Sequence, residues 1–132
     1  MKNIVNVVKS LPELLTFKQA TTTQITDAEI QLRLRFSDEY KEYLLNFGAI
    51  VAEGIELTGI AKSEHRNVVA ITKREWELNS KVPRKMYVIE NTCVDGIIIW
   101  QDQNGTIYQT SPNSEPKKIA DSLCTYLTSR VK

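Results

Sequence analysis

The most reactive side chains in this sequence belong to one histidine and two cysteines. His65 follows Ser63 and Glu64, three residue types that perform nucleophilic catalysis when their side chains converge. Neighbours on a chain do not point at one another as a catalytic triad requires. We therefore interpret His65 as an exposed loop residue and predict no catalytic residue in this segment.

The two cysteines, Cys93 and Cys124, lack the surroundings that chemistry needs. No second Cys or His stands near either of them at a metal-ligand spacing. Neither has a basic neighbour in sequence that would activate its thiol. We expect both to be packing residues in a reducing cytoplasm, with no metal and no cofactor.

A pair of carboxylates offers another route to catalysis. Asp95 and Asp102 flank the segment 96–101 and could act as acid and base if they faced each other. A strand rises about 3.3 Å per residue, so the separation along a straight strand is about 23 Å. We interpret both as turn residues and predict that the protein is not an enzyme. The alternative is an enzyme whose site is assembled from distant residues.

Charge and composition describe an ordinary small globular protein. The 132 residues are 42% hydrophobic and 25% charged, which is typical of one domain spanning 1–132. Seventeen basic and sixteen acidic residues give a net charge of +1, too little to recruit nucleic acid or an anionic membrane. Residues 86–116 hold four acids and no Lys or Arg, which predicts a negative surface. No apolar run approaches the length of a signal peptide or membrane helix, so we expect a cytoplasmic protein.

Helical signals dominate the first half of the chain. Apolar residues from Ile4 to Leu15 recur at helical spacing, and Pro12 marks either a kink or a new first helical turn. The polar run 21–24 then breaks that helix, and Thr26 with Glu29 forms a capping box for a short second helix whose Ile30 and Leu34 face the core. A third helix begins after Ser37, buries Tyr40, Tyr43, Leu44 and Phe47, and ends at Gly48.

Strand signals dominate the second half. Short strands are predicted at 50–51 and 55–57. The segment 68–78 fits either a strand, from its β-branched start, or a helix, and we favour the helix. The segments 86–92, 96–101 and 106–110 form an antiparallel meander with a hairpin at Asn104-Gly105, and four successive apolar residues, 97–100, place the middle strand inside the sheet. Ile119 and the apolar residues after it predict a final helix. The fold class is α+β: an antiparallel or mixed sheet with N-terminal helices and a C-terminal helix packed on it.

The order and spacing of these elements resemble the SUKH superfamily, which includes the Smi and Knr cell-wall regulators of yeast and many bacterial immunity proteins. The resemblance runs through the helix entry 26–30, the segment 36–48, and the segments 54–59, 87–90, 95–97 and 102–106. Thr72, Arg74 and the entry to the last helix at 120–123 continue it. One departure is Phe36-Ser37, where the family usually has Leu-Pro; a serine cap can replace that proline.

This resemblance implies an immunity protein, similar to those of LXG polymorphic toxin systems, that binds and blocks the C-terminal effector domain of a cognate toxin. A nuclease toxin has a basic cleft, which an acidic surface would occupy. We expect the partner-binding residues to be Glu53, Glu56, Glu90, Asp95 and Asp102, with Trp100 as an apolar anchor unless it is wholly structural.

A regulatory scaffold similar to the yeast members, which binds several proteins and neutralises none, is the second interpretation. A gene directly downstream of a large toxin would favour immunity. A free-standing gene whose product has several partners would favour the scaffold.

Overall fold

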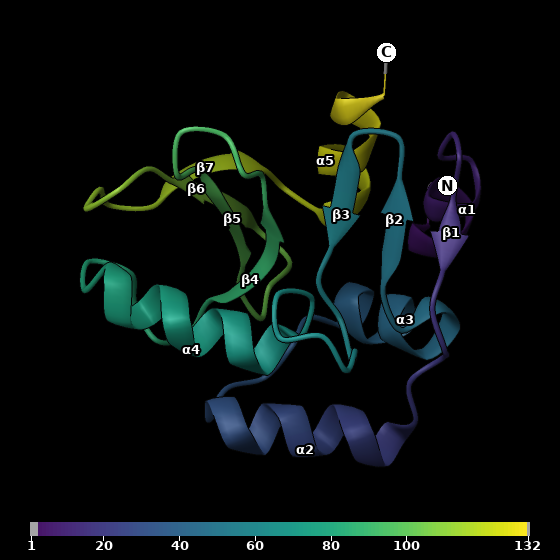
Figure 1. The fold of residues 1–132 in the computed structure, drawn as a ribbon, viewed down its shortest axis with the longest axis horizontal. Coiled ribbons are helices and arrows are strands. Elements are labelled where there is room, and N and C mark those ends of the chain that lie inside the picture. Colours follow the sequence, from purple (N-terminus) through teal and green to yellow (C-terminus); the bar gives the residue numbers. More distant parts are fainter. Residues whose placement is uncertain (1–2, 132) are drawn as a thin grey trace.

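The computed structural model describes residues 3–131 and contains five helices and two antiparallel sheets (Figure 1). The helices are α1 (Ile4–Lys9), α2 (Thr22–Leu32), α3 (Asp38–Phe47), α4 (Val68–Leu78) and α5 (Leu123–Arg130). One sheet has the order β1 (Leu15–Thr16), β2 (Ile50–Ala52), β3 (Ile55–Leu57). The other has the order β4 (Tyr87–Asn91), β5 (Ile98–Gln101), β6 (Ile107–Thr110), β7 (Lys117–Ala120). The predicted α+β class is confirmed.

Thr58 joins the two sheets directly after β3. Its N–H donates to the carbonyl of Ile89 at 2.9 Å, and its hydroxyl donates to the carbonyl of Val88 at 2.8 Å. The hydroxyl of Tyr43 donates to the Thr58 carbonyl at 2.8 Å, and the Tyr40 hydroxyl lies 2.8 Å from Thr58 Oγ1. These buried hydrogen bonds fix α3 against both sheets, because an unpaired polar group would be costly there.

Helix α3 matches its prediction at both ends. The Ser37 hydroxyl accepts the N–H of Tyr40 at 3.0 Å, and Asp38 and Glu39 lie in the first turn, where the helix dipole favours acids. All four predicted core residues of this helix are buried. Gly48 ends the helix at the predicted residue, with φ 71° and ψ −57°, a conformation that suits glycine but is not the left-handed helical cap expected there.

Two predictions near the N-terminus are wrong. Helix α1 ends at Lys9, and Leu15 lies in the short strand β1, paired with Val51 and 66% exposed. Pro12 cannot donate a helical hydrogen bond, so the chain turns there and does not continue as a kinked helix. The helical spacing of Leu15 is therefore a coincidence.

The start of α2 was also predicted in the wrong place. The capping box forms at Thr21 and Gln24: the Thr21 hydroxyl accepts the N–H of Gln24, and Gln24 Oε1 accepts the N–H of Thr21. Thr26 lies inside the helix and Ile30 is 66% exposed, whereas Leu34 follows the helix and packs against the core. Both positions fit the capping pattern, but the earlier start buries an apolar stripe of Ile25, Ala28 and Leu32.

The second sheet has one strand more than the predicted meander. Strand β4 pairs with β5, and β5 with β6 through a turn at the predicted place. Gly105 has a φ of 92° but Asn104 has no positive φ, so this is not the two-residue Asn-Gly turn that the sequence predicts. Lys117–Ala120 then adds β7 beside β6, so Ile119 lies in a strand and not in the last helix. Helix α5 begins later, after Ser122, whose hydroxyl accepts the N–H of Thr125.

Glu39 of α3 holds the start of α5 in place. Its carboxylate accepts the N–H groups of Leu123 at 2.7 Å and Cys124 at 3.0 Å, and also Nε2 of Gln101 at 3.0 Å. The N–H groups of Leu123 and Cys124 belong to the first turn of α5, where backbone amides need acceptors and the helix dipole favours negative charge. One side chain therefore connects α3, β5 and α5.

We expect Glu39→Ala to lower the free energy of unfolding by about 2 kcal/mol, since hydrogen bonds to a charged acceptor are worth more than neutral ones. Urea unfolding would measure the loss. Glu42→Ala is the matched control, because Glu42 is exposed on the same helix and its replacement should change nothing measurable. Equal losses in the two variants would contradict this role for Glu39.

Candidate partner-binding surface

Two of the predicted acidic residues are exposed on tight turns. Glu53 lies in the turn between β2 and β3, where its N–H donates to the carbonyl of Pro12 at 3.0 Å. Asp95 lies in the turn between β4 and β5, with a φ of 53°. Both turns lie at the same end of the molecule (Figure 1). We call Glu53 and Asp95 the acidic edge.

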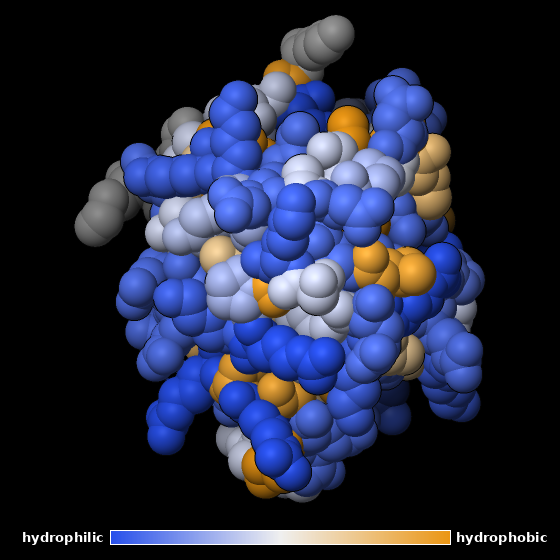
Figure 2. Space-filling view, turned by 90° about the vertical axis from the view of Figure 1, so that its left-hand side faces the viewer, coloured by the Kyte–Doolittle hydropathy of each residue, from blue (hydrophilic) through white to orange (hydrophobic). Residues whose placement is uncertain are grey.

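The face that Figure 2 turns toward the reader is largely hydrophilic, with small hydrophobic areas separated from one another. A surface of this kind lacks the broad apolar patch of a permanent interface. A partner that binds on this side would therefore meet mainly polar and charged groups, as in many non-obligate complexes.

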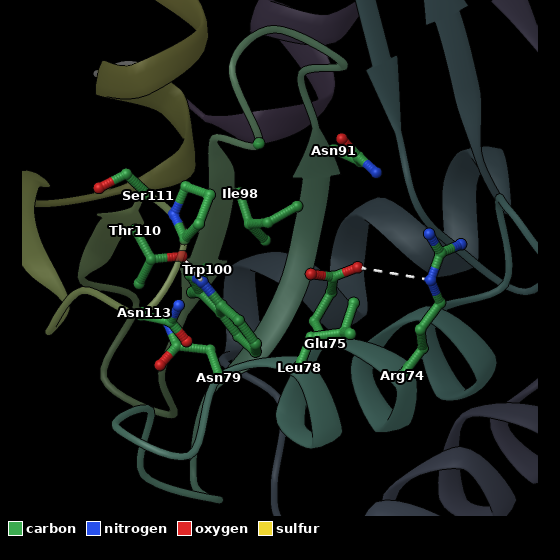
Figure 3. Close-up of a pocket in the computed structure, with 12 residues that line it drawn as sticks. Arg74, Glu75, Leu78, Asn79, Asn91, Ile98, Trp100, Thr110, Ser111 and Asn113 are labelled. Atoms are coloured by element: carbon green, nitrogen blue, oxygen red, sulfur yellow. Dashed lines mark hydrogen bonds and ion pairs between the residues drawn. The ribbon is translucent and has the colours of Figure 1, made fainter.

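A pocket of about 310 Å³ lies beside the acidic edge, between α4 and the second sheet (Figure 3). We call it the Glu75 pocket. Its lining comes from α4 and the residue after it, from β4, β5 and the turn that contains Asp95, and from the end of β6 and the segment that follows it. The lining residues are Arg74, Glu75, Leu78, Asn79, Asn91, Gly96, Ile98, Trp100, Thr110, Ser111, Pro112 and Asn113.

Glu75 is the chemically distinctive residue of this pocket. It is 8% exposed, and its carboxylate points from α4 toward the strands (Figure 3). The nearest charge is Arg74, whose Nε lies 3.8 Å away on a side chain that is itself 67% exposed. Burial raises the pKa of Glu75 above its ordinary value, and Arg74 offsets this only in part.

The sequence analysis missed Glu75, although a signal was present. Helix α4 was predicted correctly, and its buried positions include Val68, Ile71, Thr72, Glu75 and Trp76. An acid at such a position in an apolar stripe is unusual, because ionised carboxylates are rarely buried without a partner. That position could have marked Glu75 as a candidate.

Glu56 is exposed on β3 but already has a counter-ion. Its Oε1 accepts Nη2 of Arg66 at 2.7 Å, and the Arg66 guanidinium also lies over the ring of Phe17, 5.2 Å from its centre. The charge of Glu56 is therefore largely balanced within the chain, and its pull on a partner is weaker than that of Glu53.

Glu90 does not lie on the surface, contrary to its expected role. It is 2% exposed and accepts hydrogen bonds from the Tyr126 hydroxyl and from Arg130 Nη1, both at 2.5 Å. It also accepts the N–H of Glu56 at 3.3 Å. Burial, and then the nearby Glu90 charge, raises the pKa of Tyr126 well above its ordinary value. Glu90 connects β4 to α5 because burial requires its charge to be paired.

Asp102 is likewise a structural residue. It is 9% exposed, and its carboxylate accepts the N–H groups of Asn104 at 3.0 Å and Thr106 at 3.2 Å and the hydroxyl of Tyr108 at 3.1 Å. It organises the hairpin, as its interpretation as a turn residue predicted. Asp102 and Asp95 lie beyond opposite ends of β5, so they do not form a paired site.

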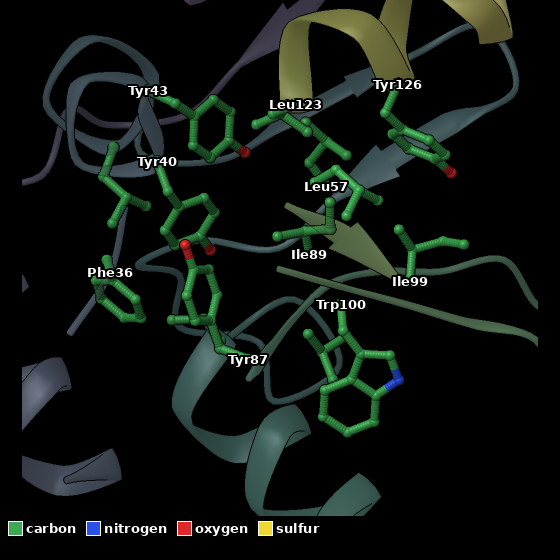
Figure 4. Packing of buried hydrophobic residues seen from close by; sticks show 14 of the residues in the cluster. Phe36, Tyr40, Tyr43, Leu57, Tyr87, Ile89, Ile99, Trp100, Leu123 and Tyr126 are labelled. Atoms are coloured by element: carbon green, nitrogen blue, oxygen red, sulfur yellow. The ribbon is translucent and has the colours of Figure 1, made fainter. Parts of the chain in front are cut away.

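Trp100 is fully buried and does not form a surface anchor (Figure 4). Its ring lies between the second sheet and α4, and its Nε1 donates to the hydroxyl of Thr110 at 2.9 Å. Strand β5 lies between β4 and β6, and all four of its residues are buried, which confirms that this strand is interior and covered on both faces. Trp100 is therefore a core residue, and the prediction that it anchors a partner is wrong.

Two expectations about the reactive residues need correction. Ser63 Oγ lies 2.5 Å from His65 Nδ1, so these near neighbours do face each other, on an exposed turn. Cys124 is buried as expected, but Cys93 is exposed. Within residues 3–131, no three His, Cys, Asp or Glu side chains gather in a way that could hold a metal ion.

Comparison with known proteins gives the same fold. Four solved chains match, among them a protein from Pseudomonas syringae pv. tomato with a TM-score of 0.74 and 20% sequence identity. That match covers 95% of this chain and 93% of the other. No curated protein matches the chain. In the described part of the chain, no helix has the length and apolar character needed to cross a membrane.

The arrangement of helices around two adjoining antiparallel sheets defines an α+β protein. The chain belongs to the family SUKH_5, described as SMI1-KNR4 cell-wall, which matches residues 1–132. The resemblance inferred from the sequence is therefore confirmed at the level of the superfamily.

Proposed function

We propose that this chain is a cytoplasmic immunity protein that binds and neutralises the C-terminal nuclease domain of a cognate bacterial toxin. The observation that carries the proposal is the acidic edge, in which Glu53 and Asp95 are exposed on two tight turns at one end of the molecule. Membership of the SUKH superfamily supports it, because many bacterial members are immunity proteins.

The physical basis is charge complementarity. A nuclease must hold a polyanion, so its cleft is basic, and exposed carboxylates steer toward such a cleft and compete with the nucleic acid. Turns supported at their backbone present these carboxylates with little loss of conformational freedom on binding. Glu56, partly balanced by Arg66, would lie beside this contact.

The test is growth of bacteria that express the C-terminal domain of the toxin encoded beside this gene, with and without this chain. The wild-type chain is expected to restore growth. The double variant Glu53→Lys/Asp95→Lys is expected to weaken binding by about tenfold or more, and so to weaken the rescue. Binding would be measured by calorimetry at two salt concentrations, because the steering contribution decreases as salt increases.

The matched control is Asp27→Lys/Glu42→Lys, which makes the same change in charge at exposed positions of α2 and α3. It should restore growth as well as the wild type. Failure of the folded wild-type chain to rescue or bind would refute immunity toward that toxin. Equal rescue by both double variants would refute the acidic edge as the contact.

A further inference from the structure

Within residues 3–131, Glu75 accepts no hydrogen bond at its carboxylate, and its one ion pair is the 3.8 Å contact with the exposed Arg74. The other two deeply buried carboxylates in this part of the chain, Glu90 and Asp102, each accept three hydrogen bonds. In the described part of the chain, the one fully enclosed side-chain polar atom without a hydrogen-bond partner is Arg66 Nε, so the Glu75 oxygens are open to the pocket. The fold itself offers this carboxylate only the distant Arg74, which leaves its charge available to a group that enters the pocket.

The walls of the Glu75 pocket indicate what could compensate it. Ile98 and Leu78 are apolar, and Leu78 is 60% exposed. The amide groups of Asn91 and Asn113 also line the space. Apolar walls leading to a carboxylate match a side chain that has an aliphatic stem and a cationic head, which describes lysine and arginine.

Size and position limit the ligand further. A volume of about 310 Å³ is at the lower end of the range for small-molecule sites, so it suits one inserted side chain. Gly96, which follows Asp95 of the acidic edge, lines the pocket. A protein that contacts the Asp95 turn of the acidic edge therefore lies next to the Glu75 pocket.

We propose that the Glu75 pocket receives a lysine or arginine side chain of the protein partner, with Glu75 as its counter-ion. This inference rests on the proposed function for the identity of the partner, but the preference of the pocket for a cation belongs to the free chain. When no partner is bound, Arg74 forms a weak ion pair with the Glu75 carboxylate. The incoming cation replaces Arg74 in this ion pair.

The first experiment tests the pocket without any partner. The ¹⁵N-labelled chain is titrated with butylguanidinium chloride, which mimics an arginine side chain, and with sodium chloride at the same ionic strength. We expect butylguanidinium to shift the indole N–H of Trp100 and the side-chain amides of Asn91 and Asn113. Glu75→Gln should abolish these shifts.

Two variants separate this site from general charge effects. Glu77→Gln is the matched control, with the same loss of charge on the same helix at a side chain that is 77% exposed; its shifts should equal those of the wild type. Arg74→Gln removes the competing cation and should strengthen butylguanidinium binding about threefold. No shifts in the pocket, or equal shifts in Glu75→Gln, would overturn the proposal.

The second experiment uses the toxin domain. Glu75→Gln is expected to weaken its binding about tenfold or more, and Glu77→Gln to leave it unchanged. If the wild-type chain binds the toxin domain and Glu75→Gln binds it equally well, the inference about the pocket fails while the proposed function stands. If the wild-type chain does not bind but butylguanidinium still shifts the pocket, the proposed function fails and the cation site stands.

Discussion

Gly48→Ala is expected to destabilise the protein by about 3 kcal/mol or more. A Cβ added at Gly48 would lie 1.9 Å from the carbonyl oxygen of Lys18, far inside any allowed contact. Its φ of 71° adds about 1 kcal/mol of backbone strain for a residue with a side chain. The clash is with backbone, so relief requires the segment before α2 to move away from the end of α3.

Gly54→Ala is the matched control for this prediction. Gly54 has the same φ of 71°, but no atom lies within 4 Å of its added Cβ. It should lose only the strain of about 1 kcal/mol. Urea unfolding followed by circular dichroism measures both variants, and equal losses would show that the close approach of Gly48 to Lys18 does not matter for stability.

Arg130→Met is expected to lower the free energy of unfolding by about 3–5 kcal/mol, because it leaves the buried Glu90 charge without its counter-ion. Methionine keeps much of the apolar stem of arginine, so the loss reports the guanidinium. That group contacts Glu90 and Tyr126 and also donates from Nη2 to the carbonyl of Gly54, which fixes the β2–β3 turn of the acidic edge.

Lys118→Met provides the comparison for this ion pair. Lys118 and Asp121 lie 2.6 Å apart, nearly as close as Arg130 and Glu90, but both side chains are more than half exposed. Solvent screens such a pair, so its loss should not change the unfolding midpoint measurably. Adding Glu90→Gln to Arg130→Met should recover part of the stability, and no recovery would argue against an uncompensated Glu90 charge.

The positions of the carboxylates also change where a partner is expected to bind. Of the acids chosen from the sequence, Glu53, Glu56 and Asp95 are exposed, whereas Glu90 and Asp102 hold the fold together. Glu75, which was not among them, lines a pocket beside Asp95. The proposed contact surface therefore keeps only Asp95 from the segment 86–116, adds Glu53 from the β2–β3 turn, and includes Glu75 from α4.

Local patterns in the sequence were sufficient wherever the deciding interactions are local. Ser37 and Gly48 mark the ends of α3 because a cap needs only the neighbouring backbone. The turn between β5 and β6 requires a positive φ at Gly105, a backbone shape that glycine adopts readily. The same reasoning went wrong at Thr26, where two capping patterns competed and the tertiary burial of Ile25 and Leu32 favoured the earlier one.

By itself, the sequence determined the α+β class, the SUKH superfamily, most helix and strand positions and the placement of β5 inside its sheet. Only the tertiary structure decided which charged residues remain exposed, because burial depends on elements far apart in the chain. Glu90 is buried because α5 packs beside it and brings Arg130, forty residues away. The spacing of Glu75 within the buried stripe of α4 marks it as an inward-facing residue, but the pocket that it lines exists only because α4 packs against the second sheet.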